Sequence, residues 1–311
     1  MTSRRALAVL RVLVSVGLLV VVARRVNPAD ALTAVRHVHP ATLLLCVALA
    51  LVGYVGRSVR WWALLKRAGV ELSHGAAWRL TLVGVAYGLA TPGRVGELAR
   101  TLHVEAPRAR TLPSVLWDRL VDVLMLELLS IPALMALGWT RGGAGLAAVL
   151  VLAATLGVAF ALDHPGVARA LARRFPRLAP RLAHWQLGAA GVLGSRAMLI
   201  GIAGGLAFYA FNFLAAWLLL QALAPVHAPA LALLFPLIIL LGNLPVAFGG
   251  LGLREQVAAS TFARLGAPAA IGPVFSLLWF AVITLVPALI GLALVHTRWR
   301  RADARLAGER A

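Results

Sequence analysis

The sequence predicts an all-α polytopic membrane protein with about six full transmembrane helices and two broken or re-entrant segments. The 311-residue chain is 61% hydrophobic and 13% charged, and its mean hydropathy is +0.88, which excludes an ordinary soluble domain. Its apolar residues form runs long enough to cross a bilayer. Two of these runs are interrupted by small residues and charge. We expect residues 1–311 to form a single integral membrane domain.

Six apolar runs predict full crossings, because a helix of about 20 apolar residues spans the hydrocarbon core. Arg4 and Arg5 before the first run resemble the start of a signal peptide. We interpret this run as a membrane helix, because no small-residue cleavage site leads into a soluble mature chain. The predicted crossings are 6–23, 41–63, 112–138, 144–162, 197–223 and 271–295, and the broken segments are 80–99 and 230–262.

The positions of arginine predict the orientation, because short arginine-rich loops stay in the cytoplasm. With each broken segment entering and leaving on one side, Arg67, Arg108 and Arg177 fall inside, whereas Arg36 and Arg264 fall outside. This predicts a multi-pass membrane protein with both termini in the cytoplasm. The two broken segments then enter from opposite sides, as in an inverted repeat. A break inside a full span would raise the count to seven or eight crossings.

Two basic segments lie outside the predicted crossings. In 163–185, between the halves, arginines recur every four residues and prolines interrupt the pattern, which predicts short amphipathic helices on the anionic cytoplasmic leaflet. A plain topology-setting loop fits this segment equally well. Residues 298–311 are predicted to form a basic cytoplasmic tail. We attribute the net charge of +19 to topology and not to nucleic-acid binding, because no soluble reading domain accompanies it.

The first break, at 91–100, combines helix-breaking residues with charge. A proline–glycine pair ends the preceding helix, and a further glycine allows close backbone approach. Three charged residues then recur at three-residue spacing on one side of a new helix. A helix N-terminus beside an arginine suits an anion, and a phosphate headgroup is the obvious anion in a membrane. Alternatively, the charges only neutralise each other and hold the turn. The residues are Pro92, Gly93, Arg94, Gly96, Glu97 and Arg100.

The second break, at 248–255, repeats this design. Three glycines open a helix whose first turn carries an arginine and a glutamate. A Gly-rich loop alone is a weak signal, and the Lys-Ser/Thr pair of a P-loop is missing, so we do not expect a nucleotide. The pairing of two such breaks, one in each half, indicates a transport site between the halves. The residues are Gly249, Gly250, Gly252, Arg254 and Glu255.

A third group of charges, Asp118, Arg119 and Asp122, lies inside a predicted crossing. Charged residues in a membrane helix must face a cavity or partners. They can counter the arginines of the breaks or carry protons, whereas salt-bridge scaffolding is the preferred interpretation for Asp118. We interpret Arg57 and Arg60, near the end of another crossing, as arginines that extend to the membrane surface, with headgroup contact as the alternative.

The remaining polar residues give no sign of catalysis or metal binding. The eight histidines have no metal-ligand spacing, and Cys46 is the only cysteine. No nucleophile elbow and no Ser-His-Asp arrangement is evident. We therefore expect no catalytic residue, no metal and no cofactor.

Four segments together resemble the lysylphosphatidylglycerol synthase transmembrane, or flippase-like, family of bacterial and archaeal membrane proteins. They occur in the family's order and roughly its spacing, so the resemblance covers nearly the whole chain. The Pro-Gly-Arg-x-Gly-Glu and Gly-Leu-Gly-x-Arg-Glu motifs are fairly specific as a pair. One departure is Asp118, where the family commonly has glutamate. The segments are Arg57 to Trp61, Thr91 to Arg100, Asp118 to Asp122 and Gly249 to Glu255.

The resemblance implies a lipid-related function. Relatives are associated with aminoacylated phospholipids, hopanoids and lipid-linked sugars, and those that add an amino acid to phosphatidylglycerol carry a soluble C-terminal domain. This sequence ends about 15 residues past its last predicted crossing, so the resemblance implies the flippase-like part without the transferase.

We therefore expect a protein that is not an enzyme and that moves an anionic lipid, or a polyprenyl-phosphate-linked precursor, across the inner membrane. Arg94 and Arg254 would hold the phosphate, and the acidic residues would balance the charge. One alternative is an accessory subunit that holds a lipid synthase or glycosyltransferase at the membrane. Another is a membrane-embedded lipid-modifying transferase with Asp118 or Asp122 as base. Membrane lipids are the expected partners in each case.

Overall fold

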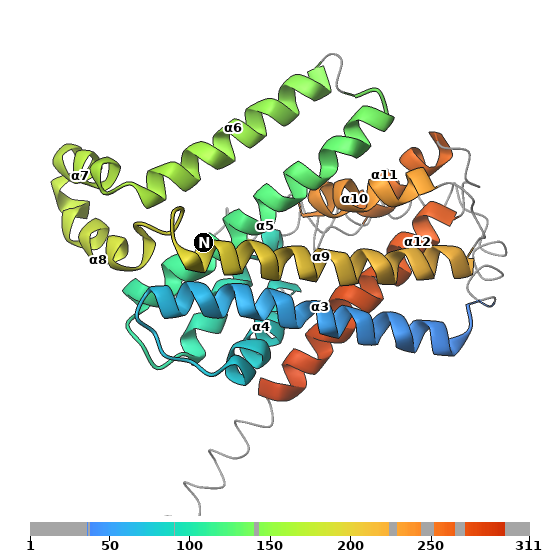
Figure 1. The fold of residues 1–311 in the computed structure, drawn as a ribbon, viewed down its shortest axis with the longest axis horizontal. Coiled ribbons are helices and arrows are strands. Elements are labelled where there is room, and N and C mark those ends of the chain that lie inside the picture. The colour runs from blue at the N-terminus through green and yellow to red at the C-terminus, as the bar shows by residue number, and fades with distance from the viewer. Residues whose placement is uncertain are drawn as a thin grey trace, which may run out of the picture.

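The computed structural model describes residues 36, 38–89, 91–139, 143–223, 229–243, 252–264 and 271–295, and the regular structure within these ranges is helical throughout (Figure 1). Four sequence-based predictions lie outside the described residues. They are the first crossing at 6–23, the glycines Gly249 and Gly250, and the tail at 298–311.

The helices follow the predicted crossings closely. Long helices are α3 (Pro40–Arg67), α5 (Arg108–Ala136), α6 (Gly143–Asp163), α9 (Arg196–Leu223) and α12 (Ile271–Phe280), which continues through a π-helical turn, Ala281–Leu285, to Val295. Shorter elements are α4 (His74–Leu89), η1 (Pro92–His103), α7 (Pro165–Arg174), η2 (Pro176–Leu178), α8 (Ala179–Ala189), η3 (Pro229–Leu233), α10 (Leu234–Gly242) and α11 (Leu253–Arg264).

Four of the described helices, α3, α6, α9 and α12 with its continuation, are long and apolar enough to cross a membrane. The 29 residues of α5 are also long enough, but this helix carries charged side chains along its length. An all-α polytopic membrane protein is therefore the fold class that the structure shows.

The pairing of α3 with α9 forms the centre of the bundle, where the two helices run antiparallel (Figure 1). Glycines allow this close contact, as they do in many membrane helix pairs. A Cβ atom on Gly204 would lie 2.5 Å from the carbonyl oxygen of Gly56, and one on Gly53 would lie 2.6 Å from the amide nitrogen of Asn212. At Gly204 the obstacle is backbone, so a side chain there would push the two helices apart, whereas at Gly53 the side chain of Asn212 would have to shift.

Each predicted break produces a hairpin. In the first, α4 packs against η1, and in the second, α10 packs against α11. The first hairpin lies between the end of α3 and the start of α5, and the second between the end of α9 and the start of α12. Because α3 and α9 are antiparallel, the two hairpins belong to opposite ends of the bundle (Figure 1). This placement is compatible with the predicted inverted arrangement, and the sidedness of the membrane stays a prediction.

The basic segment at 163–185 folds as two short helices, α7 and α8, separated by a 3₁₀ turn that begins at Pro176. They lie at the end of the bundle where α3 ends, since Arg67 donates hydrogen bonds to the carbonyl oxygens of Ala190 and Gly191 just beyond α8. Helix α6 stands apart from the bundle beside α5 (Figure 1), and only 6% of its apolar window is buried.

Candidate functional site

A cluster of charged side chains fills the interior between α3, η1 and α5. Helix α3 supplies two arginines, η1 supplies two arginines and a glutamate, and α5 supplies an arginine and two aspartates. All eight are linked by ion pairs. We call this the charged cluster; its members are Arg57, Arg60, Arg94, Glu97, Arg100, Asp118, Arg119 and Asp122.

The geometry of η1 explains why one short motif can supply three of these residues. The sequence predicts a restarted helix after the break, and the structure has a 3₁₀ helix there. A 3₁₀ helix has three residues per turn, so side chains at i and i+3 eclipse one another. Arg94, Glu97 and Arg100 therefore lie in a single row. Arg94 and Glu97 pair at 3.5 Å within that row.

The turn before η1 is held by Thr91. Its hydroxyl donates to the carbonyl oxygen of Tyr87 (3.1 Å) and accepts from the backbone N–H of Gly96 (2.6 Å). A Cβ atom on Gly96 would collide with the same Tyr87 carbonyl, so the close backbone approach expected of this glycine is present. Arg94 has a φ of 56°, the one positive φ among the described non-glycine residues. Such strain costs on the order of 1–3 kcal/mol and is held by surrounding contacts.

One end of the charged cluster is closed. Asp118 accepts hydrogen bonds from Arg60 and from Arg100, each at 2.6 Å, and all three side chains are 0% exposed. The guanidinium of Arg100 also lies 4.1 Å from the ring centre of Trp61. This saturated group agrees with the scaffolding interpretation of Asp118, because a carboxylate held by two buried guanidiniums has no access to a substrate.

The other end is more open. Glu97 pairs with Arg57 at 3.0 Å and with Arg119, while Asp122 pairs with Arg60 at 3.2 Å. The side chains of Arg94 and Arg119 remain 18% and 23% exposed, against 2% or less for the cluster's other arginines. A ligand would therefore meet these two guanidiniums first.

The interpretation of Arg57 and Arg60 as surface-seeking side chains is wrong. Their residues are 1% and 0% exposed, and both bind carboxylates inside the bundle. Glycines of the facing helix make the necessary room. A Cβ atom on Gly201 would lie 3.3 Å from Arg60 Cγ, and one on Gly205 would lie 3.1 Å from Arg60 Nη1. The glycine-rich start of α9 is thus the sequence signal that could have placed these arginines inside.

The charged cluster is not neutral, because five arginines face three carboxylates, a formal excess of two positive charges. Several of its N–H groups are buried without a hydrogen-bond acceptor among the described residues. Buried donors without acceptors are costly, so such a site favours water or an anion. These atoms are Arg57 Nε, Arg60 Nη1, Arg94 Nη2, Arg100 Nε, Arg100 Nη1 and Arg119 Nε.

Arg254, in the second hairpin, is a further buried guanidinium. It is 9% exposed and lies 4.1 Å from the ring centre of Phe280, and its Nε and Nη2 atoms have no hydrogen-bond partner in the described part of the chain. Its side chain lies against Gly242, and the next residue, Asn243, borders the same cavity as Arg94. The two broken segments therefore meet near this cavity, and a shared ligand of Arg94 and Arg254 stays a prediction.

Glu255 does not pair with Arg254 among the described contacts. Its carboxylate accepts the backbone N–H of Gly252 at 2.6 Å and the hydroxyl of Ser276 at 3.1 Å. This is a helix cap, which holds the start of α11 against α12. Gly252 has a φ of 83°, a conformation that suits glycine. Glu255 therefore has a structural role at the start of α11, and the expectation that it also balances the charge of Arg254 stays a prediction.

A small cavity of about 30 Å³ lies between the two hairpins, with room for one or two water molecules. The first hairpin contributes Arg94 to its wall, and the second contributes Asn243, the capping residue that follows α10. The π-helical turn of α12 lies on another side, where the carbonyl of Ile283 accepts a hydrogen bond from Tyr54 at 2.8 Å. Such π-helical turns are frequent at functional sites.

Two residues of this cavity were missed from the sequence. Tyr209 donates a hydrogen bond to Asp122 at 2.8 Å, and Asn212 places an Oδ1 atom without a described partner in the wall. Both lie on α9, inside an apolar crossing, and that position of a polar group is the signal that could have found them. Among the described residues, no three metal-ligating side chains gather in a group.

The fold and this site define a multi-pass helical membrane protein that holds buried charge between two broken segments. The family model of the lysylphosphatidylglycerol synthase TM region matches residues 8–291, and the chain belongs to that family. Its function is accordingly related to membrane lipids. Comparison with curated proteins and with solved structures gives no match.

Proposed function

We propose that the protein translocates an anionic lipid or lipid-linked precursor across the bacterial inner membrane and binds its phosphate between Arg94 and Arg254. The supporting observation is the excess of buried positive charge. Five arginines of the charged cluster face three carboxylates, and Arg254 adds a sixth guanidinium without a described ion pair. A phosphate supplies the negative charge and the acceptor oxygens that these groups need.

The mechanism rests on replacing water by fixed donors. A headgroup that crosses the hydrocarbon core alone loses its hydration, and charge at that depth is costly. Guanidiniums already held in place by Glu97 and Asp122 can take over the phosphate's hydrogen bonds with little reorganisation. Of the two arginines in the cavity wall, Arg57 and Arg94, Arg94 has the more exposed side chain. Asp118 with Arg60 and Arg100 acts as scaffold, and Glu255 positions the helix that carries Arg254.

The cavity between the hairpins holds only about 30 Å³, so a headgroup enters only when the hairpins separate. Binding then competes with contacts that close the cavity. Alternating access of this kind, with broken segments moving around a central site, is common among transporters.

The test is lipid movement in liposomes containing the purified protein. Fluorescent phosphatidylglycerol, phosphatidylcholine and a polyprenyl phosphate are compared for wild type, Arg94→Ala and Arg254→Ala. We expect faster movement of an anionic lipid and a loss of about tenfold in each variant, because a hydrogen bond to a charged group contributes roughly 1.5–3 kcal/mol. Arg79→Ala, an exposed arginine on α4, is the matched control and should behave as wild type.

Equal rates for the wild type and both correctly inserted variants would refute the phosphate site. The function would then shift to the accessory subunit that holds a lipid synthase or glycosyltransferase at the membrane. A transferase that uses Asp118 as base is disfavoured by the 0% exposure of that carboxylate.

A further inference from the structure

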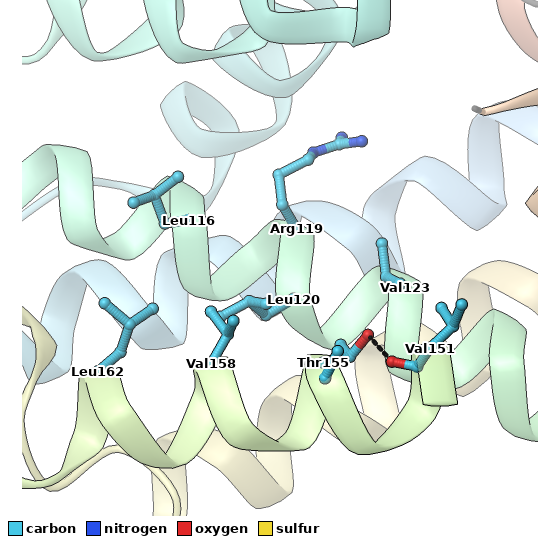
Figure 2. A pocket seen from close by; sticks show the side chains of 9 residues that line it. Leu116, Arg119, Leu120, Val123, Val151, Thr155, Val158 and Leu162 are labelled. Atoms are coloured by element: carbon cyan, nitrogen blue, oxygen red, sulfur yellow. Dashed lines mark hydrogen bonds between the residues drawn. The ribbon is translucent and has the colours of Figure 1, made fainter. Parts of the chain in front are cut away.

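A groove between α5 and α6 leads toward the charged cluster from the side of the bundle. Its volume is about 510 Å³, and apolar side chains from both helices line it, among them Leu120, Val123, Val158 and Leu162 (Figure 2). The groove is wide because α6 barely packs against the rest of the protein. Within a membrane, lipid acyl chains are the natural contents of a groove with such an apolar lining.

Arg119 connects this groove to the charged cluster. Its side-chain stem borders the groove, and its guanidinium extends away from the apolar lining (Figure 2) toward Glu97 and Asp122. The side chain is 23% exposed, the largest fraction in the cluster, and its Nε atom is buried without a described partner. An amphiphile in the groove would therefore place its apolar part against the apolar walls. Its polar end would lie near Arg119, which belongs to the positively charged cluster.

The dimensions of the groove fit one leaflet. Along α6 the lining runs from Val151 to Leu162, which at about 1.5 Å per residue gives roughly 16 Å. Half of a hydrocarbon core is about 15 Å. Leu162 is one residue from the end of α6, so the groove occupies the leaflet next to α7 and α8. Helix α7 carries the exposed arginines Arg169 and Arg173, which attract anionic lipids to that surface.

We propose that the α5–α6 groove is the lateral entrance of the protein and holds an acyl chain of an anionic phospholipid from the leaflet beside α7 and α8. Arg119 is then the first cluster residue that the headgroup meets. The substrate is a membrane lipid that enters sideways and not a soluble anion. This inference rests on the proposed function for every step after entry, although occupancy of the groove can be measured independently.

A second copy of this protein is a poorer occupant than a lipid. It would cover the apolar walls, but with 11 acidic residues against 30 lysines and arginines it would mainly bring further positive charge toward Arg119. An anionic phospholipid supplies both parts in one molecule, which is the charge complementarity that decides between them.

Two neighbouring alanines of α6 give a matched test. Ala154 lines the groove, whereas Ala153, also exposed, is not among the lining residues and lies on another side of the helix by its 100° periodicity. Purified wild type, Ala154→Trp and Ala153→Trp are incubated in liposomes with phosphatidylglycerol carrying a photoreactive acyl chain, and crosslinked peptides are mapped. We expect crosslinks on the lining residues of α5 and α6, reduced at least fivefold in Ala154→Trp and unchanged in Ala153→Trp.

Photoreactive phosphatidylcholine separates a specific site from a lipid-filled crevice, and we expect at least fivefold weaker labelling with it. Equal labelling by both lipids, or equal labelling of both tryptophan variants, would overturn the inference. Efficient oxidative dimerisation of Val158→Cys in membranes would also overturn it, because a second copy would then occupy the groove. The native thiol of Cys46 is 0% exposed and does not interfere.

Lipid movement, measured on the same samples, distinguishes the two proposals. Groove labelling without lipid movement supports the entrance and counts against translocation. Lipid movement that survives in Ala154→Trp, without groove labelling, supports translocation and removes the entrance.

Discussion

At the scale of single residues, the central problem is how a membrane protein keeps eight charged side chains in its interior. Asp118 shows one solution, since two guanidiniums bind its two oxygens at 2.6 Å and all three side chains are 0% exposed. A buried ion pair need not stabilise a fold relative to apolar residues, but removing one partner leaves an uncompensated charge. We therefore expect position 118 to be intolerant of neutral replacement.

We predict that Asp118→Asn lowers the free energy of unfolding by about 3–5 kcal/mol, because Arg60 and Arg100 lose their common counter-charge. Thermal unfolding of the purified protein in detergent, followed by tryptophan fluorescence, measures the effect. Glu71→Gln removes a carboxylate that is exposed in the loop before α4, and it serves as the control. A similar midpoint for both variants would show that Asp118 is not the anchor of the charged cluster.

Six of the eight residues of the charged cluster can be singled out from the sequence, and the reason is local. Arg94, Glu97 and Arg100 are recognisable from a three-residue spacing after a break, and their alignment needs only one helix. Arg57 and Arg60 were misplaced because an arginine near a helix end looks the same whether it reaches water or an internal carboxylate. Their burial depends on glycines of α9, more than a hundred residues away in the sequence. The spacing of residues within α3 alone cannot reveal this contact.

At the scale of elements, the contact between α3 and α9 sets the position of the charged cluster. Gly204 lies against Gly56, and Gly201 and Gly205 lie against the side chain of Arg60. The small residues therefore do two things at once. They bring the backbones together, and they leave the volume that Arg60 fills.

We predict that Gly204→Ala destabilises the protein by about 1–3 kcal/mol, since its Cβ atom would lie 2.5 Å from the carbonyl oxygen of Gly56 and the three nearest atoms all belong to the backbone. Gly157→Ala in α6 is the matched control, because a Cβ atom there meets nothing within 4 Å. That variant should unfold like wild type or slightly later. The thermal midpoints of the two variants in one detergent decide the question, and a midpoint for Gly204→Ala equal to the control would mean that the helices can separate without cost.

At the scale of the whole molecule, the crossings and the breaks follow from the sequence, because hydropathy and helix-breaking residues act locally. The structure adds the arrangement of elements that are distant in the sequence. Helix α3 pairs with α9, and the two hairpins border the same cavity. It also adds the unpacked position of α6, which no pattern within α6 indicates. A helix that is apolar all round looks alike whether protein or lipid surrounds it.

The sidedness of the membrane is the remaining whole-molecule prediction, and it follows from the arginine distribution together with the antiparallel α3 and α9. The end that carries α7, α8 and the first hairpin should face the cytoplasm, and the second hairpin should open to the opposite side. Exposed residues at both ends can be replaced by cysteine without removing an arginine. A membrane-impermeant maleimide applied to intact cells should label Ala263→Cys but label Glu71→Cys and Ala170→Cys only after lysis. Wild type, whose Cys46 is 0% exposed, gives the background. Labelling of Glu71→Cys and Ala263→Cys from the same side would exclude hairpins at opposite faces, and with them an alternating path for a headgroup between Arg94 and Arg254.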